Sequence, residues 1–256
     1  MLAIALKFDD YLGILLESAG FRQYSFFMGS NMFTDIIIYE DSDILVCHKR
    51  AGIATEGARA GKQDLVSMTR NYLARKENRN VGEAKKPPYV ATVHRLDQPV
   101  EGVIVMAKTK KAATSLAKQI KDRTTGKYYY ALCHGEFPED KGTLEDFITR
   151  TPEGFAKICD KDTDDAKKAK LDFEVIKRKD GYSLLNIKLL TGRFHQIRCQ
   201  LSSRGYPIVG DHRYGKEDDA PIISLVSYKF ELIHPTTKKK MTFEIEPDNA
   251  LIKALL

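Results

Sequence analysis

Residues 89–107 read YVATVHRLDQPVEGVIVMA, and this stretch decides the fold. Its two ends, 89–93 and 103–107, are apolar runs of strand length that are rich in β-branched residues. The polar segment between them contains a proline and a glycine, a pattern typical of a loop with a fixed path between two buried strands. That loop carries Asp97. An aspartate there either caps a turn or serves as a catalytic carboxylate on a rigid support.

The rest of the chain alternates short apolar runs with turn-forming residues. Helical periodicity predicts helices over 64–76, 110–122 and 193–204, the last ending before Gly205. Residues 150–170 are charged and weakly patterned, which predicts a surface loop or hairpin tip. Further strand patterns lie at 36–39, 44–47, 127–133, 171–178, 182–190, 222–231 and 241–246. The predicted class is α+β, with a mixed, largely antiparallel sheet and flanking helices, not a doubly wound parallel sheet.

The chain of 256 residues is long enough for one large domain or two subdomains. Residues 1–32 differ from the rest and carry a pattern for a helix over 8–18, so we predict an N-terminal extension followed by the main domain over 33–256. One hypothesis is that translation begins at Met32. The N-terminus lacks a secretory signal, and no run approaches the roughly 20 apolar residues of a membrane span. We therefore expect a cytoplasmic protein without membrane contact.

Cysteine and histidine usage argues against a metal centre. The four cysteines lie far apart and form no CxxC pair, and the six histidines show no metal-ligand spacing. We predict no metal, and the cysteines give no reason to expect a disulfide.

The net charge of +6 is unevenly distributed. Residues 1–46 hold two basic and seven acidic side chains, so the remainder of the chain has an excess of 11 positive charges. Such a body attracts a polyanion, of which RNA and DNA are the usual examples. The alternative is a basic protein without a nucleic-acid partner.

A second polar cluster, at residues 190–198, reads LTGRFHQIR. On the predicted helix, His195 and Arg198 share one face, while Phe194 and Ile197 can point into the core. This arrangement would offer hydrogen-bond donors to a phosphate or carboxylate. A solvated basic helix face is the alternative.

Several motifs occur together and in a fixed order. They are HRLD at 94–97 with Gly102, KYYYA at 127–131, TGRFHQIR at 191–198, GYPIVGD at 205–211 and YG at 214–215. In this order they resemble the RluA family of pseudouridine synthases, and the resemblance covers roughly residues 34–246. Two positions depart from the family pattern. Val100-Glu101 replaces the usual Thr-Ser before Gly102, and Arg50 replaces the proline of the early Lys-Pro-x-Gly motif. Glu101 adds a negative charge near Asp97, which could change substrate choice or raise the pKa of the aspartate.

The resemblance implies isomerisation of a uridine in RNA without a cofactor. The bond from C1′ to N1 is broken, the uracil rotates, and a bond from C1′ to C5 is formed. Asp97 is implied as the catalytic carboxylate, which either attacks C1′ or takes a proton from the sugar. Arg198 is implied to pair with Asp97 and to lower its pKa, and the ring of Tyr129 to stack on the uracil.

The same resemblance implies how the RNA is held. The target base must leave its stack, and Arg95 resembles the family arginine that fills the vacated space. A salt bridge to a nearby carboxylate is the alternative for Arg95. Other residues predicted to bind substrate are His94, Lys127, Arg193, His195 and Gln196. The expected partner is ribosomal or transfer RNA, with no obligatory protein partner and a monomer as the default.

Two other functions stay open. A non-catalytic RNA-binding or chaperone protein could use the same scaffold, and the Val100-Glu101 departure keeps that alternative alive. A nucleoside or glycoside hydrolase would need a second catalytic carboxylate, for which Glu101 is the nearby candidate.

Overall fold

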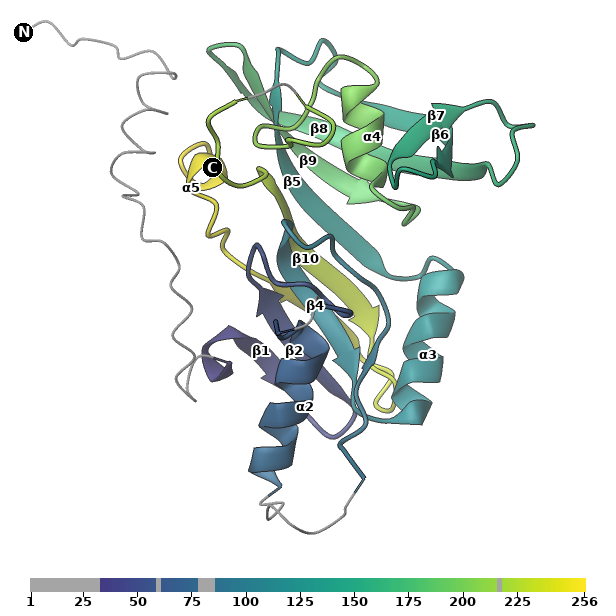
Figure 1. Cartoon of the computed structure of the whole chain (residues 1–256), viewed down its shortest axis with the longest axis vertical. Helices are drawn as coiled ribbons and strands as arrows, with labels where there is room; N and C mark the ends of the chain where they lie inside the picture. The colour runs from purple at the N-terminus through teal and green to yellow at the C-terminus, as the bar shows by residue number, and fades with distance from the viewer. Residues whose placement is uncertain (1–32, 59–60, 78–85, 216–217) are drawn as a thin grey trace, which may run out of the picture. The chain divides into compact units, whose positions relative to one another are not determined.

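The computed structural model of the chain (Figure 1) describes residues 33–58, 61–77, 86–215 and 218–256. They form two compact units. We call residues 33–127 and 227–245 the Asp97 unit, and residues 128–226 and 246–256 the Arg198 unit. The helix expected over 8–18 and the hypothesis about Met32 lie outside the described residues. The boundaries predicted for the N-terminal extension and the main domain remain predictions.

The Asp97 unit contains a sheet with the strand order β1-β2-β4-β10, in which β3 also pairs with β4, and β11 with β10. The pairs β1–β2, β2–β4, β3–β4 and β10–β11 are antiparallel. A short 3-10 helix, η1 (Thr34–Ile36), precedes the first strand. The strands are β1 (Ile37–Glu40), β2 (Ile44–Lys49), β3 (Ala91–Thr92), β4 (Glu101–Ala107), β10 (Leu225–Ile233) and β11 (Lys240–Glu244).

The two helices of this unit start where capping residues place them. Before α2 (Leu65–Lys76), the Asp64 carboxylate accepts from the Ser67 N–H at 2.7 Å. Before α3 (Lys110–Lys121), the Thr109 hydroxyl accepts from the Ala112 N–H at 3.1 Å. Each cap satisfies one backbone donor that the first turn leaves without a helical partner. Both helices confirm the predictions made from the periodicity of the sequence.

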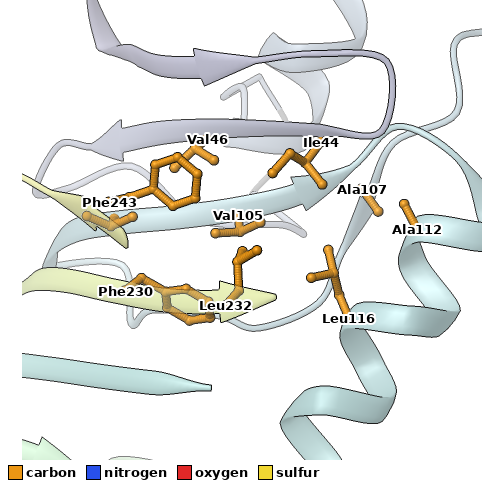
Figure 2. Packing of buried hydrophobic residues seen from close by; sticks show 10 residues of the cluster. Ile44, Val46, Val105, Ala107, Ala112, Leu116, Phe230, Leu232 and Phe243 are labelled. Atoms are coloured by element: carbon orange, nitrogen blue, oxygen red, sulfur yellow. The ribbon is translucent and has the colours of Figure 1, made fainter. Parts of the chain in front are cut away.

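The core of the Asp97 unit lies between its sheet and α3 (Figure 2). Apolar side chains of β2, β4, β10 and β11 meet Ala112 and Leu116 of the helix. Burying a large aliphatic or aromatic side chain in this way contributes roughly 1.5–3 kcal/mol. The residues labelled in Figure 2 are Ile44, Val46, Val105, Ala107, Ala112, Leu116, Phe230, Leu232 and Phe243. This core holds β4, the strand that follows the Asp97 loop.

The Arg198 unit contains strands in the order β5-β9-β8-β6-β7, and each of these neighbouring pairs is antiparallel. The strands are β5 (Gly126–His134), β6 (Lys141–Arg150), β7 (Ala156–Cys159), β8 (Lys167–Lys179) and β9 (Tyr182–Leu189). Helix α4 (Gln196–Ser202) contacts β6 and β7, and α5 (Ala250–Lys253) lies near the C-terminus (Figure 1). The antiparallel pairing and the flanking helices confirm the predicted α+β class.

Three local predictions need correction. Residues 150–170, predicted as a surface loop or hairpin tip, do contain the turn between the antiparallel β6 and β7, but they also include the strand β7 and the start of β8. The inward-facing Asp146, between the buried Leu144 and Ile148, interrupts the apolar alternation by which β6 could have been found. The strand expected at 89–93 is reduced to β3, whose two residues pair with Ala107 and Met106 of β4.

The third correction concerns the helix expected over 193–204. It begins only at Gln196, because His195 has a left-handed backbone with φ of +48°. His195 and Arg198 therefore do not share a helix face as predicted.

No helix in the described ranges is both long and apolar enough to cross a membrane.

Candidate active site

Asp97 lies on the loop between β3 and β4, and the backbone on both sides of it is held by the segment 52–55. The Thr55 hydroxyl donates to the Leu96 carbonyl at 3.0 Å and accepts from the Leu96 N–H at 3.3 Å. On the other side, the Gly52 N–H donates to the Gln98 carbonyl at 2.9 Å. Asp97 itself is half-buried. The carboxylate is therefore partly accessible on a loop with a fixed backbone, as the sequence predicted.

Lys49 lies at the end of β2 beneath this loop and is fully buried. Its ammonium group donates to the carbonyls of Ile53 at 2.7 Å, Gln98 at 3.0 Å and Arg50 at 3.3 Å. An ammonium has three donors, and here each has a carbonyl acceptor. Lys49 thus ties the segment 50–53 to the loop at the residue that follows Asp97.

The charge of Lys49 also bears on Asp97. Burial lowers the pKa of Lys49 from 10.5 to about 7, and the negative charges of Asp97 and Glu101 oppose that shift. When protonated, Lys49 is therefore a cation whose charge interacts with both carboxylates.

Glu101, one of the two departures from the family pattern, is buried at the start of β4. Its carboxylate oxygen Oε1 lies 2.8 Å from Nε2 of His48. On the other side of that ring, Nη1 of Arg50 lies 3.2 Å from Nδ1. Because a guanidinium can only donate, Nδ1 accepts and Nε2–H donates to Glu101. The two departures, Arg50 and Glu101, are thus connected through His48.

His94 is held as a neutral acceptor in the Asp97 unit. Its Nε2 accepts from the Val105 N–H at 3.1 Å, and its ring stacks on Phe230 with centroids 4.4 Å apart. Burial and the nearby charge of Lys127 lower the pKa of His94 to about 3. Burial also lowers the pKa of Lys127. These contacts position His94 in the packing, and its predicted role in substrate binding remains a prediction.

Arg95 points away from the packed side of the loop. Its side chain is 67% exposed, and Nη1 lies 3.3 Å from Oε1 of Glu56, itself 44% exposed. Exposed pairs of this kind contribute about 0–1 kcal/mol. The salt bridge considered from the sequence is therefore present, yet it would restrain Arg95 only weakly.

In the Arg198 unit, Arg198 is buried on α4 and fixed by Asp211. Nε donates to Oδ2 at 2.8 Å and Nη2 to Oδ1 at 2.6 Å, a bidentate pair. The backbone N–H groups of Arg213 and Tyr214 also donate to Oδ1 of Asp211, at 3.1 and 3.2 Å. Asp211 thereby sets the orientation of the guanidinium plane. The pairing of Arg198 with Asp97 remains a prediction.

His195 and Gln196 are both buried, and the structure gives each a local role. Nδ1 of His195 lies 2.9 Å from the Tyr214 hydroxyl, which accepts from the Ala156 N–H. The Gln196 side-chain oxygen accepts from the Thr191 hydroxyl at 2.7 Å and from a backbone N–H at 3.1 Å, and its NH₂ group donates to the Gln200 side chain at 3.0 Å. These bonds fix the turn before α4. Contact of either residue with substrate remains a prediction.

The two remaining predicted residues are Arg193, before α4, and Tyr129, on β5. Arg193 is half-buried, and its Nε donates to the Lys168 carbonyl at 2.9 Å. Tyr129 is buried on β5, whereas its neighbours Tyr128 and Tyr130 are half-buried; stacking of Tyr129 on a uracil remains a prediction.

Lys49, Asp211 and Tyr214 lie within sequence motifs, but no role was predicted for them. Lys49 acts mainly through backbone carbonyls, which leave no partner visible in the sequence. Asp211 follows Arg198 by 13 residues, and only the fold brings the two together. The motif positions were the available signal.

Comparison with known proteins identifies the family of the chain. Residues 43–203 match the family model described as RNA pseudouridylate synthase. An uncharacterized RNA pseudouridine synthase of Aquifex aeolicus is 34% identical over 225 residues, which are 82% of this chain and 68% of the relative. The ribosomal large subunit pseudouridine synthase D of Borreliella burgdorferi is 35% identical over 199 residues, 77% of this chain and 60% of the relative. The chain thus spans about two thirds of the length of these curated relatives.

Solved structures show the same fold. Human RNA pseudouridylate synthase domain containing 4 matches with a TM-score of 0.71 and 19% identity, over 88% of this chain and 94% of that one. Human RNA pseudouridylate synthase domain containing 1 matches with a TM-score of 0.66 and 24% identity, over 86% and 93%. Family model, relatives and fold agree with the RluA-type motifs of the sequence. The chain belongs to the RNA pseudouridylate synthase family, a family of intramolecular isomerases.

Proposed function

We propose that this chain converts a uridine of ribosomal large-subunit RNA to pseudouridine, with Asp97 as the catalytic carboxylate. The observation that carries the proposal is the support of Asp97: a half-buried acid on a loop held by Thr55, Gly52 and Lys49. The choice of ribosomal RNA over transfer RNA rests on the names of relatives such as the enzyme of Borreliella burgdorferi.

The reaction needs few groups, because it exchanges one bond at C1′ for another. In one route, the Asp97 carboxylate attacks C1′, the electron pair of the C1′–N1 bond goes to the uracil, and C5 of the rotated base then displaces the carboxylate. In the other, Asp97 takes a proton from the sugar carbon next to C1′ while the uracil leaves with the electron pair of the C1′–N1 bond; C5 of the rotated base then bonds to C1′ of the unsaturated sugar, and the proton returns to the neighbouring carbon. In both, C5 loses its proton and N1 gains one, so the overall change is an isomerisation. Both routes use the carboxylate form of Asp97.

The remaining site residues are proposed to act at the same place. The Arg198 guanidinium, oriented by Asp211, would pair with Asp97, and Tyr129 would stack on the uracil. A flipped base leaves a gap in its stack. Arg95, exposed and weakly paired, can move into that gap at little cost.

The test compares Asp97→Asn with the wild-type protein on transcripts of large-subunit ribosomal RNA and of transfer RNA. We expect Asp97→Asn to form no pseudouridine, measured by mass spectrometry of digested RNA, and to keep the wild-type melting temperature and RNA affinity. Asp35→Asn, a change at an exposed aspartate, is the matched control and should retain full activity. Pseudouridine made by pure Asp97→Asn protein would refute the role of Asp97.

The alternative of a non-catalytic RNA chaperone is tested in cells. A map of pseudouridines in RNA from a strain lacking the protein should miss one or more sites, and the same map identifies the RNA. An unchanged map would favour the chaperone.

A further inference from the structure

The Arg198 unit has arginines of two kinds. Three of its arginines form ion pairs with aspartates: Arg178 with Asp140 at 2.8 Å, Arg198 with Asp211 at 2.6 Å and Arg204 with Asp146 at 3.0 Å. The other three have no carboxylate partner within the part of the chain that the structure describes, and they are Arg150, Arg193 and Arg213. Their positive charges are therefore not neutralised locally.

Two of these arginines lie over phenylalanine rings. The guanidinium of Arg150 is 4.5 Å from the centre of the Phe194 ring, and that of Arg213 is 4.6 Å from the centre of the Phe155 ring. Both arginines are exposed, and both phenylalanines are half-buried. A guanidinium on an aromatic face keeps its charge while its plane is restrained.

The two rings are connected by two further rings. Phe194 stacks on His195 with centroids 3.7 Å apart, His195 meets Tyr214 edge-on at 5.5 Å, and Tyr214 meets Phe155 edge-on at 5.8 Å. We call this set the ring row, and its members in order are Arg150, Phe194, His195, Tyr214, Phe155 and Arg213.

The ring row is anchored from below. Phe194 and Tyr214 pack against a buried cluster that includes Ile148 of β6 and Cys199 of α4. The Tyr214 hydroxyl is bound to both His195 and the Ala156 N–H. The rings, and the arginines on them, are therefore restrained by the core of the unit before any ligand arrives.

We propose that the ring row is a second RNA-contacting surface, in which Arg150 and Arg213 bind backbone phosphates of the substrate. This proposal rests on the proposed function, because it takes RNA as the partner. The planar fork of arginine matches a phosphate with two parallel hydrogen bonds, and restrained guanidinium groups lose less entropy on binding. Arginine planes also serve as stacking surfaces for unpaired bases of RNA. The excess of 11 positive charges outside residues 1–46 is of the sign that such a partner requires.

The test measures binding of a fluorescein-labelled RNA hairpin with a uridine in its loop, between about 50 and 200 mM salt. For the double variant Arg150→Gln/Arg213→Gln we expect a Kd raised about tenfold and a slope of log Kd against log salt reduced by about 1 for each arginine. The control, Lys110→Gln/Lys111→Gln, removes the same charge from exposed positions at the start of α3 and should change the Kd less than about twofold.

Two more variants separate the contribution of the positive charge from that of the arginine geometry and of the ring beneath Arg213. Arg150→Lys/Arg213→Lys keeps both charges, so we expect the salt slope of the wild type with a Kd raised a few-fold. Phe155→Leu removes the ring under Arg213 and should likewise weaken binding without changing the slope. Melting curves of each variant check the fold, and the lysine variant keeps the test valid if the glutamine variant does not fold.

The outcomes are distinct. The proposal would be overturned if Arg150→Gln/Arg213→Gln binds RNA like the wild type or like the Lys110→Gln/Lys111→Gln control. It would also be overturned if that arginine variant loses as much affinity for poly-L-glutamate as for RNA. Pseudouridine formation by the wild type is measured separately. If the glutamine variant loses RNA affinity but the wild type makes no pseudouridine, the RNA surface stands and the proposed function is refuted. If the wild type makes pseudouridine but the glutamine variant binds RNA normally, only the RNA surface is refuted.

Discussion

At the scale of single residues, a buried lysine is the feature that most affects the proposed catalyst. Lys49 is surrounded by carbonyl groups, and its charge interacts with Asp97 and Glu101. Burying an ammonium group costs free energy, which the carbonyl contacts and the two acids offset. The lysine therefore both holds the backbone of the loop and places a charge near its carboxylate.

The lowered pKa of Lys49 predicts a pH dependence of stability. Between about pH 7 and its ordinary pKa of 10.5, the unfolded lysine is protonated and the buried one is not, so the folded state gains stability as the pH rises. We expect the unfolding free energy of the wild type, relative to Lys49→Met, to increase by up to about 1.4 kcal/mol per pH unit above pH 7. Urea unfolding from about pH 6 to about pH 9 measures it.

The matched control is Lys111→Met, at an exposed lysine, for which the difference from the wild type should not depend on pH in that range. A Lys49→Met difference that is equally flat would show that the buried ammonium keeps its proton.

At the scale of elements, the approach of β4 to β10 depends on a glycine. Gly102 has φ of +151°, and a Cβ there would lie 2.5 Å from the Cβ of Ser227 and 2.6 Å from its carbonyl oxygen. We expect Gly102→Ala to destabilise the protein by about 3 kcal/mol or more, because the strands must separate. Gly181→Ala, at φ of +80° with open space around it, should cost only about 1 kcal/mol. Thermal unfolding of both variants compares them, and equal losses would contradict the steric argument.

The elements that sequence could predict are those with local signals. Helices α2 and α3 follow from their periodicity and from Asp64 and Thr109 as caps. Strand β6 could not be predicted, because Asp146 faces inward and is satisfied by the distant Arg204 and Gln200. The predicted start of α4 was wrong because of another distant contact. The left-handed backbone of His195 accompanies a contact with Tyr214, which lies 19 residues away in the sequence.

At the scale of the whole molecule, the proposed function assigns Asp97 and Arg198 to the same reaction, so variants of the complete protein test whether the two residues act together. We expect Asp97→Glu, which keeps a displaced carboxylate, and Arg198→Ala each to lower kcat, and the double variant Asp97→Glu/Arg198→Ala to lose less than the product of the two single losses. Rates of pseudouridine formation on the same RNA provide the cycle. Losses that multiply would mean that the two residues act independently.

The motifs were enough to predict the family and the candidate residues, because HRLD and TGRFHQIR are long and occur in a fixed order. They did not predict the contacts that hold the Asp97 loop and Arg198 in place. The bonds from Thr55 to Leu96 and from Lys49 to Gln98 link residues more than 40 positions apart. The fork of Asp211 on Arg198 likewise depends on the fold. Such contacts depend on three-dimensional proximity, which periodicity along a single chain does not encode.

The attachment of the Asp97 loop to the segment 49–55 has a consequence for genetics. A substitution in the loop that shifts its backbone can be compensated most directly by a second change in that segment, because Thr55, Gly52 and Lys49 hold the displaced atoms. A screen for revertants of impaired loop alleles should therefore recover second-site changes at 49–55 more often than in the strand directly downstream. The two stretches are expected to evolve as a pair, and transplanting the loop into another scaffold would require moving both.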